Sequence, residues 1–381
     1  MTRFFRSAID RGTFGIVQRL DEDGNAIDEF GTKTNEPTIN RFTAAIETQR
    51  VLDQKTHTIL FARYSYEDVR LYNLQSLLVR PALEPDSKVR LSRLGVSFVR
   101  DTRERCERGL FTGSRAANGD ETGRPGEVCR YNQVDATRGY FFTADYAVAL
   151  RQLGGNISLQ RFQTTYRQYY KLDALRGTVF AGNVTLGLAN LFNPRDRDAN
   201  GRIDEIDLTL PISERFFSGG STTLRGFAFE EAGPRQVLMP EGEFRDGNGD
   251  VVLLNPFTVP VGGNALAIVN LEARIPVTRA FQVVPFYDGG NVFRRVGDLF
   301  GKRKDTPPND LAAANLRAHW TNSVGLGFRI QTPLGGALAI DYGFLLNPPQ
   351  FLIPQGPNGE DPPATYRLNR TQVHFRFTQT F

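Results

Sequence analysis

Hydrophobic and polar residues alternate with a period of two along several segments of about ten residues. In residues 323–330, SVGLGFRI, every second residue is apolar, and the residues between them are Ser, Gly or Arg. The same alternation occurs in residues 140–150, 268–277, 337–346 and 373–381. Because successive side chains of a strand point to opposite faces, each segment predicts a β-strand with one apolar face and one small or charged face.

The whole chain contains about twelve segments that we predict to be strands. They span residues 5–20, 38–51, 56–72, 88–101, 138–151, 156–171, 176–190, 265–277, 280–293, 319–332, 336–348 and 365–381. Short turns alternate with long polar loops, which follow Leu20, Phe192, Phe293 and Pro348. The connection that holds the two cysteines is the exception, because strand parity places it among the short turns.

Two kinds of fold use strands with one apolar face. A soluble sandwich buries the apolar faces between two sheets and exposes the polar faces to water. A transmembrane barrel turns the apolar faces toward lipid and the polar faces toward its lumen, with short turns at one rim and long loops at the other. The connection lengths favour the barrel, so we predict an all-β fold: a transmembrane, antiparallel, up-and-down β-barrel.

The composition agrees with an all-β protein. The chain has 29 Phe, 12 Tyr and 37 Gly in 381 residues, a mixture rich in strand and turn formers. It contains no run of about 18 apolar residues, which excludes a transmembrane helix. The net charge of +4 comes from basic and acidic residues scattered along the chain, so nothing in the sequence indicates a nucleic-acid partner. The N-terminal residues lack the apolar stretch of a secretory signal.

Cys106 and Cys129 are the only cysteines, and both lie in one polar, Gly-rich connection. Two thiols that close one loop predict a disulfide, which would add roughly 3 kcal/mol of stability by restricting the unfolded chain. A disulfide would also indicate an oxidising compartment. The alternative is two unpaired cysteines, since a zinc site would need further ligands that are not nearby.

Residues 219–235, GGSTTLRGFAFEEAGPR, have the composition of a mobile surface loop. They nevertheless set Arg225 among small or apolar neighbours, namely Leu224, Gly226 and Phe227. A solvated charge in a turn is the simplest interpretation. The alternative is a guanidinium inside an enclosed lumen, which needs a carboxylate partner because it carries five donors and keeps its charge.

Four motifs occur in a fixed order along residues 219–381. They are LRGF at 224–227, FYDGGNVF at 286–293, TPLGGALAIDYG at 332–343, and an aromatic C-terminal strand that ends at Phe381. In these motifs the chain resembles the BamA/TamA superfamily, the outer-membrane protein assembly and translocation barrels also called bacterial surface antigens. The half before residue 219 matches more loosely, through VRDTRE at 99–104.

Barrels of this superfamily have sixteen strands, and periplasmic POTRA domains and a signal peptide precede them. The resemblance implies that residues 1–381 form one outer-membrane barrel domain that is N-terminally incomplete, with about twelve strands visible and the POTRA domains absent. A genuine twelve-stranded barrel is the alternative. The resemblance also implies that residues 192–264 form a long loop that folds into the lumen.

In the superfamily, the arginine of the lumen loop pairs with an acidic residue on the barrel wall. The resemblance makes Asp288 the first choice of partner for Arg225. Asp341 is the second choice, because the alternation of its strand points it inward. Gly226 would allow the loop to approach the wall closely, and the apolar residues expected to pack beside the pair are Leu224 and Phe227.

Phe377 and Phe381 belong to the C-terminal strand, and ordinary lipid-facing residues of a barrel would look the same. The resemblance adds a second role for them, as a signal recognised during the insertion of the barrel itself. Neither interpretation identifies what the protein acts on.

Residues 196–207, DRDANGRIDEID, fit the spacing of a calcium-binding loop through its sixth position. The candidate ligands are Asp196, Asp198, Asn200, Asp204 and Asp207. The last of these stands where an EF-hand has Glu and is one methylene shorter, and no helices are expected to flank the loop. A solvated polar loop is therefore an equal alternative to a calcium site, and no other cofactor is expected.

The sequence gives little support for catalysis. The three histidines lie far apart, and no G-x-S-x-G, H-E-x-x-H or Walker motif occurs, so we predict that the protein is not an enzyme. The resemblance implies a barrel in the bacterial outer membrane that assembles, inserts or translocates other outer-membrane proteins without nucleotide. Its expected partners are the lipid bilayer, unfolded outer-membrane protein clients and accessory periplasmic proteins. A passive channel, a two-partner-type secretion pore and an inactive barrel fragment are the alternatives.

Overall fold

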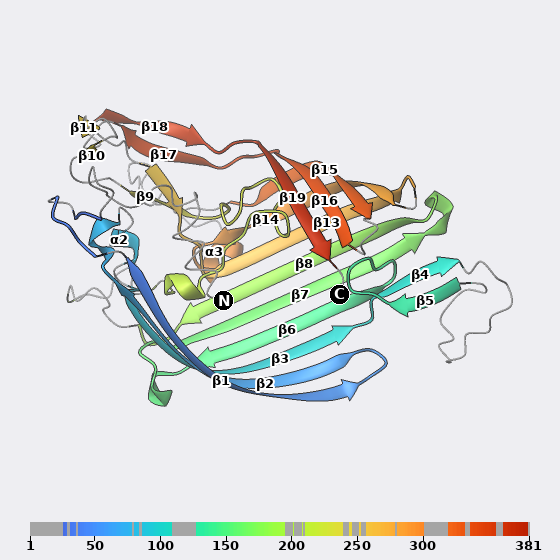
Figure 1. The fold of residues 1–381 in the computed structure, drawn as a ribbon, viewed down its shortest axis with the longest axis horizontal. Helices are drawn as coiled ribbons and strands as arrows, with labels where there is room; N and C mark the ends of the chain where they lie inside the picture. The colour runs from blue at the N-terminus through green and yellow to red at the C-terminus, as the bar shows by residue number, and fades with distance from the viewer. Residues whose placement is uncertain are drawn as a thin grey trace.

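One antiparallel sheet of eleven strands dominates the computed structural model of the chain (Figure 1). The order of its strands in space follows their order in the sequence, which is an up-and-down arrangement. The strands are β1 (Thr38–Asp53), β2 (Thr58–Tyr72), β3 (Lys88–Asp101), β6 (Gly139–Ala149), β7 (Leu159–Leu172), β8 (Thr178–Leu191), β13 (Ala265–Pro276), β14 (Phe281–Phe293), β15 (Thr321–Gln331), β16 (Gly336–Leu345) and β19 (Thr371–Gln379). The predicted all-β, antiparallel class is confirmed.

The structure describes residues 26–28, 31–35, 37–77, 80–83, 86–108, 127–194, 201, 208, 210–238, 244–245, 251–252, 257–278, 280–300, 319–331, 336–355 and 361–379. Within these ranges the α-helices are short, namely α2 (Arg80–Leu83) and α3 (Val296–Phe300). None of the described helices has the length and apolar character needed to cross a membrane.

Eleven predicted strands correspond to the eleven strands of the sheet, and the first predicted strand, residues 5–20, lies outside the described residues. The prediction of one strand over residues 365–381 is wrong at its start. Residues Asp361–Arg367 form β18, which pairs with β17 (Gln350–Gln355) in a separate hairpin. The chain bends before β19 because the buried Leu368 packs into the core and its N–H donates to the carbonyl of Pro349 (3.2 Å).

The connections differ in length between the two ends of the sheet. At the short-turn end, on the right of Figure 1, brief turns join β1 to β2, β7 to β8, β13 to β14 and β15 to β16. At the long-loop end lie the connection between β8 and β13, the connection that contains α3, and the connection that contains the β17–β18 hairpin. The connection between β3 and β6 is the exception, because it places the hairpin β4 (Glu104–Arg108) and β5 (Glu127–Tyr131) at the short-turn end.

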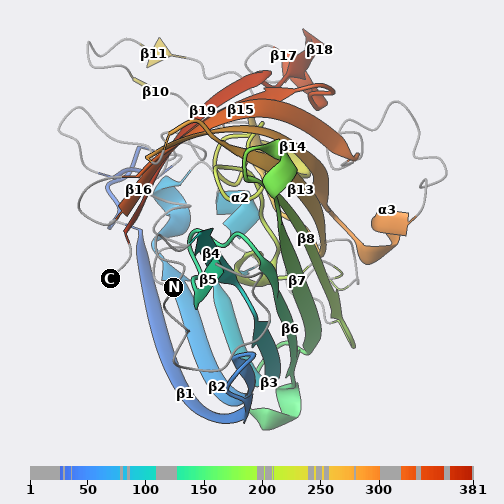
Figure 2. The ribbon, with the colours of Figure 1, turned by 90° about the vertical axis from the view of Figure 1, so that its right-hand side faces the viewer.

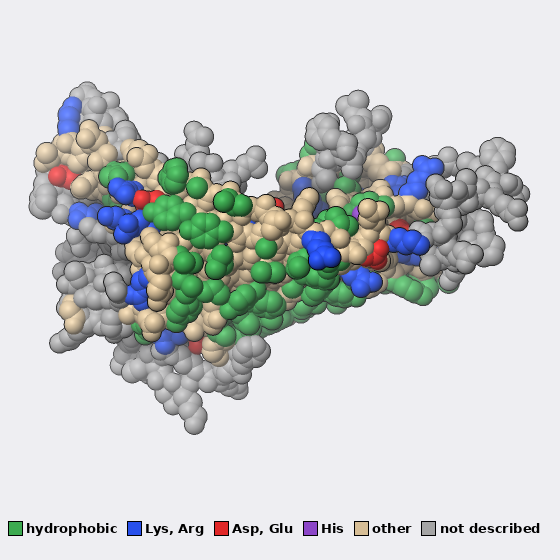
Figure 3. Space-filling view, turned by 90° about the horizontal axis from the view of Figure 1, so that it is seen from below, with side chains coloured by type: hydrophobic (Ala, Val, Ile, Leu, Met, Phe, Trp, Pro, Cys, Tyr) green, Lys and Arg blue, Asp and Glu red, His purple; other side chains and the backbone are tan. Residues whose placement is uncertain are grey.

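The sheet curls, so that its strands follow one another round most of a ring (Figure 2). β1 and β19 are the two edges of the described sheet. Large apolar side chains are exposed on the convex face, where Ile46 of β1 is 76% exposed and Phe375 of β19 is 72% exposed. Figure 3 shows apolar side chains gathered along one side of the molecule. Other members of this exposed set are Leu94, Tyr166, Val184, Leu271, Leu326 and Tyr342.

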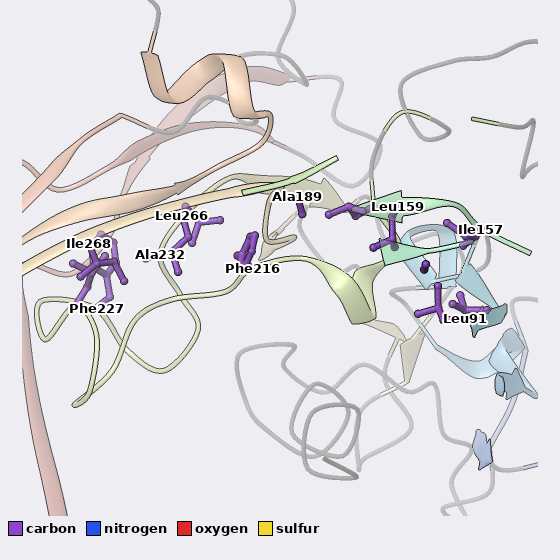
Figure 4. Packing of buried hydrophobic residues seen from close by; sticks show 14 of the residues in the cluster. Leu91, Ile157, Leu159, Ala189, Phe216, Phe227, Ala232, Leu266 and Ile268 are labelled. Carbon is purple, nitrogen blue, oxygen red and sulfur yellow. The ribbon is translucent and has the colours of Figure 1, made fainter. Parts of the chain in front are cut away.

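The core lies between the concave face of the sheet and the connection that joins β8 to β13. Phe216, Phe227 and Ala232 of this connection pack with Leu266 and Ile268 of β13 (Figure 4). The buried interior is therefore formed by a connection on a sheet and not by two sheets face to face. This is the arrangement expected of a barrel and not of a sandwich.

Cys106 and Cys129 form the expected disulfide and lie directly opposite each other in the β4–β5 hairpin. The same connection reaches other parts of the ring at the short-turn end. Lys171 at the end of β7 donates to the carbonyl of Cys106 (3.2 Å), and Gln331 at the end of β15 donates to Asp135 Oδ2 (3.1 Å). The described part of this connection therefore lies at the short-turn opening of the ring, where Figure 2 shows β4 and β5.

The two faces of β8 lead to a first prediction for the chain in lipid vesicles. Val184 is 49% exposed on the convex face, whereas Thr185 lines a cavity on the concave face. We expect Val184→Arg to lower the free energy of unfolding by roughly 2–4 kcal/mol, because a charge facing hydrocarbon is costly. Thr185→Arg should cost much less, as measured by urea unfolding of both variants. Equal losses would contradict the assignment of the faces.

Candidate functional site

The site is built on the backbone of residues 219–227, which forms a compact turn. The N–H of Gly220 donates to the carbonyls of Leu224 (3.2 Å) and Phe227 (3.1 Å). The N–H of Gly219 donates to Thr223 Oγ1 (2.9 Å). These bonds fix the direction in which Arg225 leaves the backbone. We call residues 219–235 the arginine loop.

Arg225 makes three hydrogen bonds to Asp288 of β14. Its Nε donates to Oδ2 (2.8 Å), its Nη2 donates to Oδ1 (2.6 Å), and its backbone N–H donates to Oδ2 (3.0 Å). Arg225 is 4% exposed and Asp288 is 0% exposed. The paired N–H···O bonds between guanidinium and carboxylate fix orientation as well as charge. Arg225 thus contacts the residue that the sequence analysis ranked first.

Two further groups enclose the guanidinium of Arg225. Its Nη1 donates to Oε2 of Glu272 on β13 (3.2 Å), and Glu272 also accepts from Nε of Arg274 (2.8 Å). The guanidinium carbon lies 3.5 Å from the centre of the Phe286 ring, which is a cation–π contact. The guanidinium therefore has carboxylates at its edge and an aromatic ring on its face.

Asn270 of β13 also holds the backbone of the arginine loop on the concave face of the sheet. Its Nδ2 donates to the carbonyl of Thr223 (2.6 Å) and to Asp288 Oδ1 (2.8 Å). The register of β13 and β14 places Asn270 directly opposite Asp288. One amide thus connects the loop backbone to the carboxylate that holds the loop side chain.

The arginine loop also contacts β19, which is an edge of the sheet. Nε2 of His374 lies 3.0 Å from the carbonyl oxygen of Arg225. Nη1 of Arg376 donates to the carbonyl of Ser221 (3.3 Å). Both contacts involve backbone carbonyls of the loop, so they depend on the path of the loop and not on its side chains.

Glycines bring the loop and the wall into direct contact. A Cβ on Gly226 would lie 2.7 Å from a side-chain carbon of Leu345 and 2.8 Å from Cβ of Ser323. A Cβ on Gly343 of β16 would lie 2.2 Å from the carbonyl oxygen of Arg225. These separations are too short for any larger residue, so the close approach requires glycine on both sides.

Asp341, the second candidate partner, also faces the concave side and is fully buried. It accepts a hydrogen bond from Nη1 of Arg329 on the neighbouring β15 (2.7 Å). Asp341 therefore neutralises an arginine of the wall, while Asp288 neutralises the arginine of the loop.

The remaining residues singled out from the sequence fall into three groups. Leu224 and Phe227 are buried in the core beside the ion pair. Phe377 is exposed on the convex face of β19. The others lie outside the described residues and are Phe381 and the candidate calcium ligands Asp196, Asp198, Asn200, Asp204 and Asp207.

Among the described residues, one group of Glu and Cys side chains is close enough together to hold a metal ion: Glu104, Cys106 and Cys129. Both sulfurs of this group are used in the disulfide, so they are not free to act as thiolate ligands.

A second ion pair anchors the preceding part of the connection to the opposite side of the ring. Glu214, at the end of the short helix η5 (Ile212–Glu214), is 4% exposed. Its Oε1 accepts from Nη2 of Arg93 on β3 (2.6 Å), and Nη1 of Arg161 on β7 lies 3.9 Å from its Oε2. The connection is thus held on β3 and β7 by Glu214 and on β13 and β14 by Arg225.

The electrostatics of the loop pair follow from its burial. Burial alone lowers the pKa of Arg225, but the hydrogen bonds and the negative charge of Asp288 outweigh it and hold this pKa above its usual value. The guanidinium therefore keeps its charge. Loss of one partner of such a buried pair costs roughly 3–5 kcal/mol, because the other partner stays buried and uncompensated.

The sequence analysis did not single out several residues that complete the site. Asn270, Glu272 and His374 lie on the polar faces of predicted strands. This alternation was the sequence pattern that could have indicated them as inward-facing residues. Glu214 and Phe286 gave no signal of this kind. Their convergence depends on strand register and on the curl of the sheet, which no local pattern contains.

The fold and the site together define a class of protein: a curled antiparallel sheet whose concave face holds an inward-folded loop through a buried arginine–aspartate pair. The family model of the Omp85 superfamily domain matches residues 129–381, more than half of the chain, and the chain belongs to this superfamily. The resemblance inferred from the sequence motifs is thereby confirmed.

Three solved structures are similar to this chain. BamA from Haemophilus ducreyi lacking POTRA domains 1-3 is 16% identical, with 89% of this chain and 62% of that chain covered and a TM-score of 0.44. CdiB from Escherichia coli is 11% identical, with 91% and 46% covered and a TM-score of 0.46. CdiB from Acinetobacter baumannii is 12% identical, with 82% and 39% covered and a TM-score of 0.40. The chain therefore spans less than two thirds of the length of each.

We expect Arg225→Ala to release the arginine loop while the sheet stays folded. The substitution leaves Asp288 buried without its main partner, at a local cost of roughly 3–5 kcal/mol. Hydrogen exchange of residues 219–227 should become much faster. The matched control is Arg329→Ala, which breaks a buried Arg–Asp pair within the wall and should leave the exchange of these residues unchanged. Unchanged exchange in Arg225→Ala would show that the pair does not hold the loop.

We expect Glu214→Gln to loosen the other anchor of the connection. Glutamine keeps the shape of the side chain but leaves Arg93 without its charged partner, a loss of roughly 1–3 kcal/mol. Hydrogen exchange of residues 212–218 should rise, while residues 219–227 remain protected by the Arg225 pair. Loss of protection in both segments together would mean that the two anchors are not independent.

Proposed function

We propose that this chain is the barrel part of an outer-membrane protein that assembles, inserts or translocates other outer-membrane proteins without nucleotide. The observation that supports this best is the burial of Arg225, from the LRGF motif, against Asp288, from the FYDGGNVF motif. Two sequence motifs of the superfamily meet in one site, which binds and positions a loop. The protein would act by holding strands in place and not by catalysis.

In this proposal the sheet closes into a barrel in the bacterial outer membrane. The convex face, with its exposed apolar side chains, would meet hydrocarbon, and the concave face would line the lumen. The short-turn end would face the periplasm, where a disulfide such as Cys106–Cys129 is stable and where accessory proteins could bind. That the chain supplies about twelve strands of a sixteen-stranded superfamily barrel stays a prediction.

The two edge strands suggest how such a barrel would bind an unfolded client protein. β1 and β19 carry backbone N–H and C=O groups that are not used by a second neighbour in the described sheet. An unfolded outer-membrane protein could add a strand to such an edge, with main-chain hydrogen bonds for affinity. Burial of its apolar side chains in lipid would drive the reaction, so no nucleotide is required.

The arginine loop would control the position of one edge. It is held on β13 and β14 by Arg225 and Asn270, and it touches the edge strand β19 through His374. A fixed loop therefore gives β19 a fixed support. A displaced loop would leave β19 free to move relative to the rest of the sheet.

A passive channel or secretion pore is the second candidate function. A cavity of about 960 Å³ lies beside the concave face of the first strands and is lined by polar and charged residues such as Arg63, Arg93 and Asp145. Such a surface would suit a water-filled path through a closed barrel. In a pore the arginine loop would act as an obstruction, whereas in an assembly barrel it would act as a support.

These functions can be separated with the 381-residue chain reconstituted in lipid vesicles. We expect the chain to accelerate the insertion of an unfolded client barrel, and Arg225→Ala to slow this by about tenfold or more, since removal of one partner of a buried pair costs roughly 3–5 kcal/mol. Arg329→Ala serves as the control and should keep most of the activity. Planar-bilayer conductance is measured in parallel. High conductance in Arg225→Ala without any client insertion by the unmodified chain would favour the pore.

A further inference from the structure

A small cavity lies on the concave face of the sheet, beside the arginine loop. Its volume is about 200 Å³, and Arg167 of β7, Arg376 of β19 and residues 221–223 of the loop are among its lining residues. Figure 2 shows β7 and β19 on different parts of the ring. The loop, one inner strand and one edge strand of the sheet therefore meet at this cavity.

The positive charges of this cavity outnumber the negative ones. The described lining residues include four arginines and one glutamate, which are Arg167, Arg225, Arg274, Arg376 and Glu272. Arg225 is neutralised by Asp288, with Nη2 and Oδ1 2.6 Å apart, and Arg274 by Glu272, with Nη2 and Oε1 2.6 Å apart. Two of the four arginine charges in this lining are thereby balanced, and the charges of Arg167 and Arg376 remain.

Neutral groups hold these two arginines in place. Nε of Arg167 donates to Oδ1 of Asn183 (3.3 Å), and its guanidinium carbon lies 5.7 Å from the centre of the Phe141 ring. Nη1 of Arg376 donates to the carbonyl of Ser221 (3.3 Å). Among the described residues, no carboxylate oxygen lies within 4.0 Å of a guanidinium nitrogen of either arginine. Since a guanidinium has five N–H donors, each arginine keeps donors for a further acceptor.

The chemistry of the lining favours an oxyanion. The planar fork of a guanidinium matches the oxygens of a phosphate, and the hydroxyl groups of Ser221 and Thr222 line the same cavity as further donors. A phosphate group carries a charge of roughly −1.5 to −2 near pH 7, which matches the two remaining positive charges. The cavity is smaller than the roughly 300–1,000 Å³ of pockets for larger organic ligands, so its size suits a small anion.

We propose that this cavity binds one small oxyanion of the phosphate class between Arg167 and Arg376. The side chain of Arg167 is exposed, so the anion can enter from the space inside the curl of the sheet. Binding requires the folded sheet and the arginine loop, but not the proposed assembly activity.

The bound anion would connect the edge strand β19 to β7 and to the arginine loop. The hydrogen bonds between β19 and the loop run from His374 and Arg376 to backbone carbonyls of the loop. An anion that accepts from Arg376 and from Arg167 would add charge-assisted hydrogen bonds, which are roughly twice as strong as neutral ones. The anion would therefore act as a ligand that stabilises β19 in its position beside the loop.

Isothermal titration calorimetry of the folded 381-residue chain in detergent tests the proposal. The probe is inorganic phosphate, with chloride used to keep the ionic strength constant. We expect one phosphate to bind per chain. Arg167→Gln and Arg376→Gln should each weaken binding by about tenfold or more, the change that loss of one charge-assisted contact produces. Acetate, with a single charge, should bind more weakly than phosphate.

Arg63→Gln is the matched control, because Arg63 is another exposed arginine of the concave face and does not line this cavity. It should bind phosphate like the unmodified chain. Absence of phosphate binding by the unmodified chain, or an equal loss in Arg63→Gln, would overturn the proposed site. Acetate binding as tight as phosphate binding would overturn the assignment of the anion.

Hydrogen exchange of residues 371–379 tests the connection to the edge strand. Phosphate should slow this exchange in the unmodified chain and leave it unchanged in Arg376→Gln. Exchange that phosphate does not alter in the unmodified chain would overturn the proposed stabilisation of β19. Glycerol 3-phosphate distinguishes the sources of the anion: weaker binding than that of phosphate supports a free anion, and tighter binding supports the same site with a small phosphorylated solute as its ligand.

Discussion

A guanidinium that is buried on the concave face of a sheet needs a negative charge beside it. The residues around Arg225 supply this charge. Asp288 supplies the charge and Glu272 a second carboxylate, while the ring of Phe286 covers the face of the guanidinium. The contact is possible only because Gly226 and its counterpart on β16 let the two backbones approach. A buried ion pair adds little net stability compared with well-packed apolar residues of the same size. Its paired hydrogen bonds fix the orientation of the loop arginine relative to β14.

The connection between β8 and β13, which contains the arginine loop, also explains how a single curled sheet can have a hydrophobic core. Its apolar residues pack on β13, and its two ion pairs attach it to strands on different sides of the ring. Glu214 binds β3 and β7, and Arg225 binds β14, so a change in the curl of the sheet would have to stretch or break one of the two anchors. In a two-sheet sandwich this bracing comes from the facing sheet. In this protein it comes from one connection placed inside the curl.

Much of the fold was predictable from the sequence because the side-chain period of a strand is a local property. The alternation in residues 323–330, for example, places every apolar residue on the convex face of β15. The prediction failed at residue 365, because residues 365–367 belong to β18 and a bend at the buried Leu368, which depends on tertiary contacts, separates them from β19. For the site, the motifs led to Arg225 and Asp288, but the roles of Glu214 and Phe286 could not be predicted. Which inward residues meet depends on strand register and curl, and these are set by the whole sheet.

The contacts of the arginine loop with β13 and β14 are stronger than its contacts with β19. This difference affects how the edge strand β19 could separate from the loop. On one side, a bidentate ion pair, a second carboxylate and Asn270 hold the loop on β13 and β14, and removal of one partner of a buried pair costs roughly 3–5 kcal/mol. On the other side, β19 is joined to the loop by two hydrogen bonds to backbone carbonyls, from His374 and Arg376. Such bonds contribute about 0.5–1.5 kcal/mol each, or up to about 3 when a charged group takes part, so they are the first to break. Under the proposed function, β19 could separate from the loop to receive a client strand while the loop itself stays in place. The ion pair would then act as the fixed reference against which the edge of the sheet moves.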